Sequence, residues 1–314
     1  LSNEKIDVNF KYVTTTREMP PNESFDPNKY ESKKTVLAMA VENKDTKIVD
    51  LLLKNKTVNP NIMCKSLIDH SWGPGEKPEY EIKTEKTPLY IAVENEDDKM
   101  VQLLLSCDQT DVNAICKYSS TYYKFVPKKL GDIIAFGDYV NGFSKAHQKY
   151  NNIEQTALHC AVEKGNAKIV ELLLRNENID INAIYKNTND HKWQKNENFG
   201  EDKDTEKTAL CIAIENEFND IVQLLLENEK IDVNIPCITT KKSFKWIQNK
   251  DAGDSFSYDY VVNSHLKSDV KSTQEKKSVL HIAVENENID VIKMLLNSNI
   301  NVDSTDYNGK KPVE

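Results

Sequence analysis

The chain is poor in cysteine, tryptophan and glycine for its length. Among 314 residues there are 6 Cys, 3 Trp and 9 Gly. Six cysteines are too few for a disulfide scaffold in a chain of this size. No Cys-x-x-Cys or cysteine–histidine spacing accompanies them, so neither a metal site nor another cofactor is expected. Cys64, Cys116 and Cys237 recur at one position of an internal repeat, where we expect reduced, half-buried thiols and where the third copy has Tyr185.

Positive charge and long apolar runs are also lacking. The chain has 41 Lys and Arg against 50 Asp and Glu, a net charge of −9, so the basic footprint of a nucleic-acid-binding protein is missing. No apolar run reaches the roughly 18 residues that a membrane span needs. The opening, LSNEKIDVNF, has no signal-peptide pattern and no initiating Met. We therefore expect a cytoplasmic protein and a sequence cut from a longer one.

What the chain does have is repetition. One unit recurs five times, as KTVLAMAVENKDTKIVDLLLKN from Lys34, KTPLYIAVENEDDKMVQLLLSC from Lys86, QTALHCAVEKGNAKIVELLLRN from Gln155, KTALCIAIENEFNDIVQLLLEN from Lys207 and KSVLHIAVENENIDVIKMLLNS from Lys277. Each copy has two apolar stripes at helical spacing, a polar turn between them, and a Thr or Ser in front that can cap the first helix. The pattern predicts stacked helix–turn–helix units. Each unit is followed by an extended segment, here called the exit of the repeat, that leads to the next unit.

The repeated residues resemble the ankyrin repeat. The shared pattern is T-x-L-x-x-A, then I-V-x-L-L-L, then D-V-N, and the third copy keeps the family's Gly165-Asn166 turn. The resemblance implies an all-α repeat fold, an ankyrin solenoid of helix–turn–helix units with elongated β-hairpin or loop insertions. It also implies that His159 and His281 stabilise the helix-capping turn. The expected units are the end of a preceding repeat at 1–12, full repeats at 34–65, 86–117, 155–186, 207–238 and 277–305, and the start of a further repeat at 306–314.

Four copies depart from the family at the glycine between the two helices. The residues there are Lys44, Glu96, Glu217 and Glu287. A left-handed backbone conformation at this position is unfavourable without Gly. After Gly, Asn is the residue that best tolerates the left-handed conformation. Because an Asn precedes each of these four residues, we expect that Asn to reduce the strain of the turn. These asparagines are Asn43, Asn95, Asn216 and Asn286.

Long inserts separate the units, at 13–33, 66–85, 118–154, 187–206 and 239–276. They hold 136 of the 314 residues but 19 of the 25 aromatic residues, including every Trp. These rings either form small cores within and between the inserts or serve as anchors for a partner. The anchors we expect are Trp72, Tyr80, Phe125, Trp193 and Trp246. By formal count, the net charge is −3 for each short insert (66–85 and 187–206) and +2 for each long insert (118–154 and 239–276). Neighbouring inserts, which we expect to project as fingers, should therefore attract each other weakly.

One acidic position is the same in all five copies. In ankyrin folds this position faces the concave groove, and here it is Glu42, Glu94, Glu163, Glu215 and Glu285. The glutamates either form an acidic track for a basic partner or make a repeated hydrogen bond to the neighbouring turn. Catalysis has little support, because Asp69-His70 and Asp190-His191 are neighbours on extended chain, whose side chains point to opposite faces.

The predicted function is a non-catalytic protein-binding scaffold, recognising an unidentified protein partner through its concave face and its aromatic-rich fingers. Two alternatives stay open. The long fingers, with Tyr123-Lys124-Phe125 and Lys128-Lys129, resemble an interfacial anchor that would bind a membrane surface. The chain could also be a structural tethering segment of a longer ankyrin array.

Overall fold

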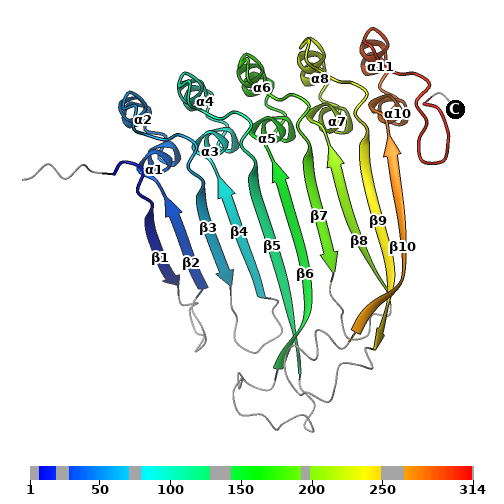
Figure 1. The fold of residues 1–314 in the computed structure, drawn as a ribbon, viewed down its shortest axis with the longest axis horizontal. Coiled ribbons are helices and arrows are strands. Elements are labelled where there is room, and N and C mark those ends of the chain that lie inside the picture. Colours follow the sequence, from blue (N-terminus) through cyan, green and yellow to red (C-terminus); the bar gives the residue numbers. More distant parts are fainter. Residues whose placement is uncertain are drawn as a thin grey trace, which may run out of the picture.

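The computed structural model describes residues 7–18, 28–70, 79–127, 143–191, 199–248 and 265–312. Two layers of short helices run along the top of the molecule, and one broad sheet extends from them (Figure 1). The inner helices, next to the sheet, are α1 (Val36–Glu42), α3 (Pro88–Glu94), α5 (Ala157–Glu163), α7 (Ala209–Glu215) and α10 (Val279–Glu285). The outer helices are α2 (Thr46–Leu53), α4 (Asp98–Leu105), α6 (Ala167–Leu174), α8 (Asn219–Leu226) and α11 (Ile289–Leu296).

The expected helix caps are present. Thr35, Thr87, Thr208 and Ser278 each accept a hydrogen bond from an amide in the first turn of an inner helix, as a capping hydroxyl should. In the third repeat, Thr156 and His159 form a capping box, in which the backbone amide of Thr156 donates to Nδ1 of His159 at 3.2 Å. The other ring nitrogen of His159 bonds the Ala183 carbonyl at 3.0 Å, which confirms that this histidine stabilises the turn.

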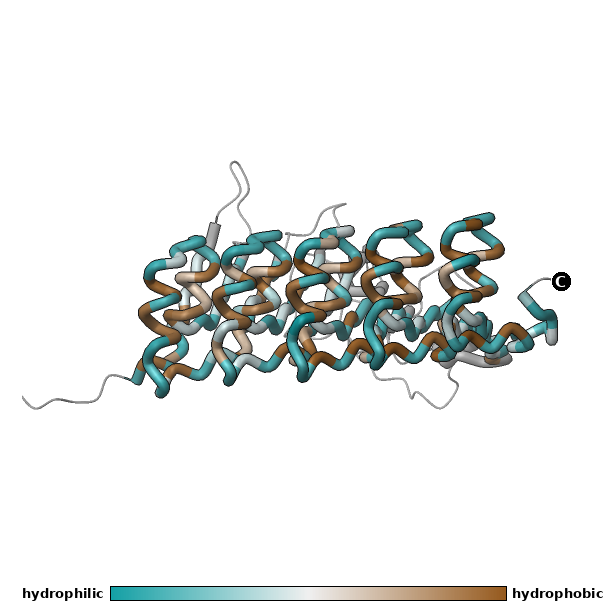
Figure 2. Tube along the Cα trace, turned by 90° about the horizontal axis from the view of Figure 1, so that it is seen from above, coloured by the Kyte–Doolittle hydropathy of each residue, from teal (hydrophilic) through white to brown (hydrophobic). Residues whose placement is uncertain are grey.

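The core of the array lies between neighbouring helix pairs. Viewed from above, the hydrophobic stretches of the helices lie where successive pairs face one another (Figure 2). The side chains buried there come from every repeat and include Leu37, Leu89, Leu158, Leu210 and Leu280. No helix is longer than 8 residues in the described part of the chain, so helical stability depends on this packing rather than on intrinsic propensity.

An asparagine at each exit fastens one repeat to the next. The amide of Asn113 donates to the Asn178 carbonyl at 2.7 Å and accepts the Asp180 amide at 2.8 Å. The same two-bond bridge recurs at the other junctions, from Asn9, Asn61, Asn182 and Asn234. The final N of the D-V-N motif therefore acts between repeats.

The inserts form one continuous antiparallel sheet. Its strands follow sequence order, and each pairs with both neighbours except at the two edges. They are β1 (Tyr12–Glu18), β2 (Asn28–Lys34), β3 (Cys64–His70), β4 (Glu79–Lys86), β5 (Cys116–Pro127), β6 (Phe143–Gln155), β7 (Tyr185–His191), β8 (Phe199–Lys207), β9 (Cys237–Gln248) and β10 (His265–Lys277). The solenoid was predicted correctly, but the all-α class was wrong, because strands make up about as much of the molecule as helices.

The turn between the helices corrects a second prediction. Lys44, Glu96, Glu217 and Glu287 themselves have positive φ, between 53° and 58°, as does Gly165 at 68°. The asparagines before them have negative φ and end the inner helices. The asparagines therefore do not adopt the left-handed conformation and do not reduce the strain in the expected way. In this turn the left-handed residue is the one that follows the Asn.

Candidate functional site

The inner helices and one side of the sheet share a surface, which we call the groove face. It carries the strand residues that point to the same side as Lys34, Ser66, Thr84 and Lys86; the other side is the outer face. Along the groove, the last lysine of a hairpin pairs with the glutamate that ends the following inner helix. The pairs are Lys34–Glu42 at 2.7 Å, Lys86–Glu94 at 2.7 Å, Lys207–Glu215 at 2.5 Å and Lys277–Glu285 at 2.8 Å.

The third repeat breaks this pattern, because Gln155 stands where the other copies have lysine. Its side-chain amide donates to the Tyr90 hydroxyl at 2.5 Å, in the preceding repeat. Among the described residues Glu163 has no lysine partner. Its surroundings in the groove raise its pKa through partial desolvation, although its side chain is exposed to solvent. Glu163 is therefore the groove carboxylate that lacks a neutralising ion pair.

A pocket of about 320 Å³ opens in the groove between the first and second repeats. The first two lysine–glutamate pairs form its walls, and its floor includes Ser66 and Thr84, whose hydroxyls are 2.5 Å apart. At the equivalent rung of the next hairpin, Tyr118 faces Ile153. These larger side chains occupy the space that Ser66 and Thr84 leave open, so the pocket interrupts an otherwise periodic surface.

Below the pocket, the groove face becomes apolar. Tyr30, Ile68 and Ile82 lie side by side across β2, β3 and β4, and Tyr80 lies one rung further down. The rings of Tyr80 and Tyr122 are 6.1 Å apart, and desolvation among these neighbours raises the pKa of Tyr80. We call Tyr30, Ile68, Tyr80, Ile82 and Tyr122 the aromatic patch.

The outer face carries ladders of opposite charge, with apolar or aromatic side chains such as Val13, Leu67 and Tyr150 among them. Lys65 pairs with Glu85 at 2.5 Å and Lys117 with Glu154 at 2.8 Å, each across a single hairpin. Lys242 pairs with Asp204 at 3.0 Å and so joins a long insert to a short one. The described hairpins are joined chiefly by backbone pairing, so charge attraction is a minor contribution to their contact.

Comparison with known proteins agrees with this architecture. A family model described as ankyrin repeats (3 copies) matches residues 18–116 and 135–237, and a single-repeat ankyrin model matches residues 275–307. Together these matches cover well over half of the chain.

The chain belongs to the ankyrin repeat family.

Solved structures similar to this ankyrin repeat protein include two other ankyrin proteins. The ankyrin repeat domain of Bcl-3, described as a unique member of the IkappaB protein family, is 17% identical with a TM-score of 0.44; the match covers 89% of this chain and 78% of that one. EF0377, an ankyrin repeat protein, is 17% identical with a TM-score of 0.42; that match covers 88% and 87%. No curated protein matches the sequence.

The structure places only part of the predicted aromatic set. Tyr80 lies in the aromatic patch, next to Tyr122. Trp72 and Trp193 lie outside the described residues, and for Phe125 and Trp246 only the backbone positions, in β5 and β9, are described. The segment from Tyr123 to Lys129, the suggested membrane anchor, likewise has no described side chains. Their role in binding stays a prediction.

The five groove glutamates end the inner helices, and their role in binding a partner stays a prediction. What sequence reasoning missed is the lysine eight residues earlier, which neutralises four of the five. The signal was present, since a Lys precedes the capping residue in the same four copies and Gln155 replaces it in the third. The lysine neutralises the glutamate because the end of each hairpin lies beside the end of the inner helix that follows it.

The cysteine prediction was wrong for one of its three residues. Cys237 is joined to Cys211 in a disulfide, whereas Cys64 and Cys116 are buried free thiols. In the fourth repeat alone, among the described residues, both positions that meet at this point are cysteines. Within the described residues there is no cluster of three or more His, Cys, Asp or Glu side chains able to hold a metal ion, and no helix long and apolar enough to span a membrane.

Proposed function

We propose that this ankyrin repeat protein is a non-catalytic scaffold that binds a partner protein on its groove face. Ankyrin repeats generally mediate protein–protein interaction, and the family match supports a binding role of that general kind. The proposal adds a location. The partner contacts the inner helices and the upper half of the sheet, from the pocket down to the aromatic patch.

The observation that carries this proposal is the aromatic patch on a single-layer sheet. Among the described residues, no helix or second sheet lies over either side of the strands (Figure 1). Tyr is among the residue types that contribute most to protein interfaces. An apolar and aromatic cluster on such an uncovered sheet is a surface on which a partner can be anchored.

The ion pairs above the patch favour a partner with basic residues at its upper edge. In each of the four pairs the carboxylate is the more exposed member; for example, the side chain of Glu94 is 37% exposed and that of Lys86 is 22% exposed. An approaching chain therefore meets the carboxylates first. Glu163, which has no lysine beneath it, is the position where a partner's Arg or Lys gains most.

The chain offers a closely matched pair of sites for testing this proposal. Tyr122, on the groove face, is 44% exposed; Tyr150, on the outer face of the adjacent strand β6, is 38% exposed. A photo-crosslinking amino acid is placed at one or the other position, and the protein is irradiated in lysate from its source. We expect a crosslinked protein from position 122 and none from position 150.

Loss of binding must then follow from changes in the patch. Tyr80→Ser and Ile82→Ser are expected to abolish capture of the crosslinked protein, whereas Tyr150→Ser leaves it unchanged. Circular dichroism and thermal unfolding check that the variants remain folded. Crosslinks from position 150 alone, or capture that survives both patch substitutions, would contradict the proposal.

A further inference from the structure

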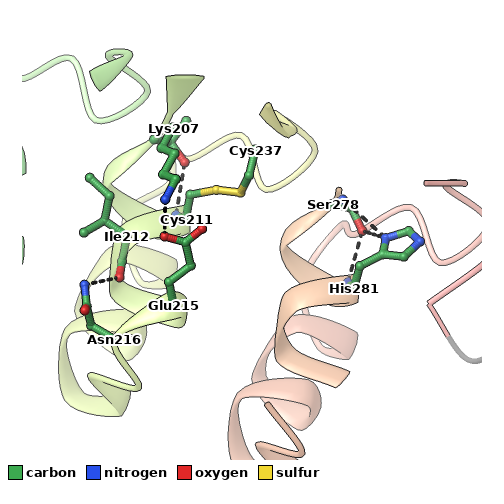
Figure 3. The surroundings of a disulfide bond; sticks show 9 residues. Lys207, Cys211, Ile212, Glu215, Asn216, Cys237, Ser278 and His281 are labelled. Carbon is green, nitrogen blue, oxygen red and sulfur yellow. Dashed lines mark hydrogen bonds and ion pairs between the residues drawn. A yellow bond between two sulfur atoms is a disulfide. The ribbon is translucent and has the colours of Figure 1, made fainter. Parts of the chain in front are cut away.

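The helix layer and the sheet are joined covalently at one place. Cys211 lies in the first turn of α7 and Cys237 is the first residue of β9; their Cα atoms are 6.2 Å apart, within the usual range for a disulfide. Both side chains are buried, with exposed fractions of 0% and 6%. The bond lies beside the Lys207–Glu215 ion pair of the groove (Figure 3).

The same two repeat positions can be followed through the first three copies. They are occupied by Ala38 and Cys64 in the first repeat, Tyr90 and Cys116 in the second, and His159 and Tyr185 in the third. In the third repeat the two rings are 6.1 Å apart. The approach of the inner helix to the next strand is thus a property of the fold, and the fourth repeat uses it for a covalent bond.

The other repeats show what Cys211 replaces. His159 bonds the exit of its repeat through the Ala183 carbonyl at 3.0 Å, and His281 does the same through the Lys310 carbonyl at 3.0 Å. Cys211 stands at the position of these histidines and cannot make that bond. With the disulfide open, the fourth repeat has neither the histidine bridge nor the covalent one.

We propose that Cys211 and Cys237 form a reversible redox clamp, which fastens the fourth repeat's inner helix to the sheet when oxidised and releases it when reduced. A small disulfide such as glutathione disulfide serves as oxidant. The Cys237 thiolate, from the more exposed of the two residues, displaces one glutathione and forms a mixed disulfide. The Cys211 thiolate then displaces the second glutathione. Two electrons pass from the cysteine pair to the glutathione disulfide, and the two thiol protons end on the two glutathione molecules.

Burial and position give the clamp two properties. Because both sulfurs are shielded, exchange requires α7 and β9 to separate transiently, so it is slower than in an unfolded peptide. The two cysteines are 26 positions apart, so the bond also closes a loop that runs from the first turn of α7 through α8 to the start of β9. Closing this loop restricts the unfolded chain and stabilises the repeat.

The test begins with the wild-type chain after equilibration with oxidised or reduced glutathione. Alkylation of the unfolded protein followed by intact-mass measurement is expected to show four modified cysteines in the oxidised sample and six in the reduced one. The thermal midpoint is expected to fall on reduction by roughly 5–10 °C. Amide exchange should rise in α7 and at the start of β9, with little change in the first repeat. Six alkylated cysteines after oxidation, or equal midpoints, would overturn the clamp.

Variants separate the clamp from a general effect of thiols. Cys211→Ala combined with Cys237→Ala should remove the redox dependence, whereas Cys64→Ala and Cys116→Ala should keep it. Cys211→His should give a fourth repeat that is stable and insensitive to glutathione, because it restores the histidine bridge. Ala38→Cys is expected to gain a second disulfide, to Cys64; the absence of this bond would show that the facing repeat positions do not suffice for pairing.

Discussion

Single residues set the backbone of each helix–turn–helix unit. The turn needs a left-handed residue, which is Gly165 in the third repeat and Lys or Glu in the other four. A residue with a side chain in that conformation is disfavoured by roughly 1–2 kcal/mol, partly offset because Gly loses more entropy on folding. Four turns are therefore less stable than the family pattern allows.

The first prediction concerns these turns. Glu217→Gly is expected to raise the free energy of unfolding by about 0.5–1 kcal/mol, because it removes the left-handed strain at a residue whose φ is 58°. Gly165→Ala should lower it by about 1 kcal/mol or more, since the new Cβ would lie 3.1 Å from the Phe218 ring and would also be strained. Urea titrations measure both; a destabilising Glu217→Gly would show that the left-handed residue is not a source of strain in this turn.

The second prediction concerns pH. Burial lowers the pKa of His159 from its usual 6.5 to about 4. The unfolded chain therefore binds a proton that the folded chain does not, between pH 6.5 and 4. Stability from this residue is complete above pH 6.5 and is lost as the pH falls towards 4, with a slope of at most about 1.4 kcal/mol per pH unit.

His159→Gln is the matching control for pH, because Gln can complete a capping box without titrating. Its stability should vary less between pH 6.5 and 4 than that of the wild type, as measured by urea midpoints at each pH. Equal slopes for the two proteins would show that another group causes the acid sensitivity.

At the scale of elements, the helices were predictable and the sheet was not. The apolar stripes, the capping residues and the D-V-N motif can each be recognised in a short stretch of sequence. This is possible because the two helices of a repeat are close in sequence and pack against each other. Strands such as β1 and β2 lack a clear alternation of apolar and polar residues, because both sides of the sheet are open in the described part of the chain. Pairing between successive inserts also links residues more than 30 positions apart, which no local pattern encodes.

The candidate site follows the same division. The groove positions of the glutamates came from the family resemblance, and Tyr80 came from the concentration of aromatics in the inserts. The aromatic patch as a whole depends on register, since Tyr30 lies opposite Ile68 and Ile82 only when three strands pair in one alignment. A shift of one residue would place these side chains on the other side of the sheet.

The third prediction concerns the junction between repeats. Asn113→Ala removes both bonds to the following repeat, so it should destabilise the protein by about 0.5–1.5 kcal/mol for each bond lost. Asn176→Ala removes one bond within its own repeat and should have a smaller effect. Amide exchange should increase on both sides of the Asn113 junction only; equal effects of the two variants would mean that the bridge does not link the repeats.

At the scale of the whole molecule, two arrays run side by side. The helices stack as a solenoid, and the hairpins pair as a sheet, with the exit asparagines near the line where the two meet. Each repeat therefore contacts its neighbours twice, once through side chains in the helix layer and once through backbone bonds in the sheet. A substitution that weakens the contacts of one layer should therefore destabilise the array less while the other layer is intact.

The fourth prediction follows from this double contact. Replacing residues 118–154 with a short turn removes β5 and β6 and separates β4 from β7. Amides of β4 and β7 that now bond to β5 and β6 should lose protection from exchange, whereas α3 and α5 stay protected because the helix layer still joins them. Hydrogen exchange with mass spectrometry measures this; complete loss of protection in α3 and α5 would show that the sheet is required for the helices to fold.

The helix layer and the sheet also have nearly the same distance between successive repeats. Neighbouring strands lie about 4.8 Å apart, so a hairpin advances the sheet by about 9.6 Å, and packed helices are separated by 8–10 Å. Because these steps are commensurate, an insert can lengthen along its strands without altering the pitch of the array. The backbone hydrogen bonds of the sheet run along the array axis, so a pull on the two ends loads them directly. A helical solenoid alone behaves as a spring; with this sheet attached, the same array becomes a plate that resists extension.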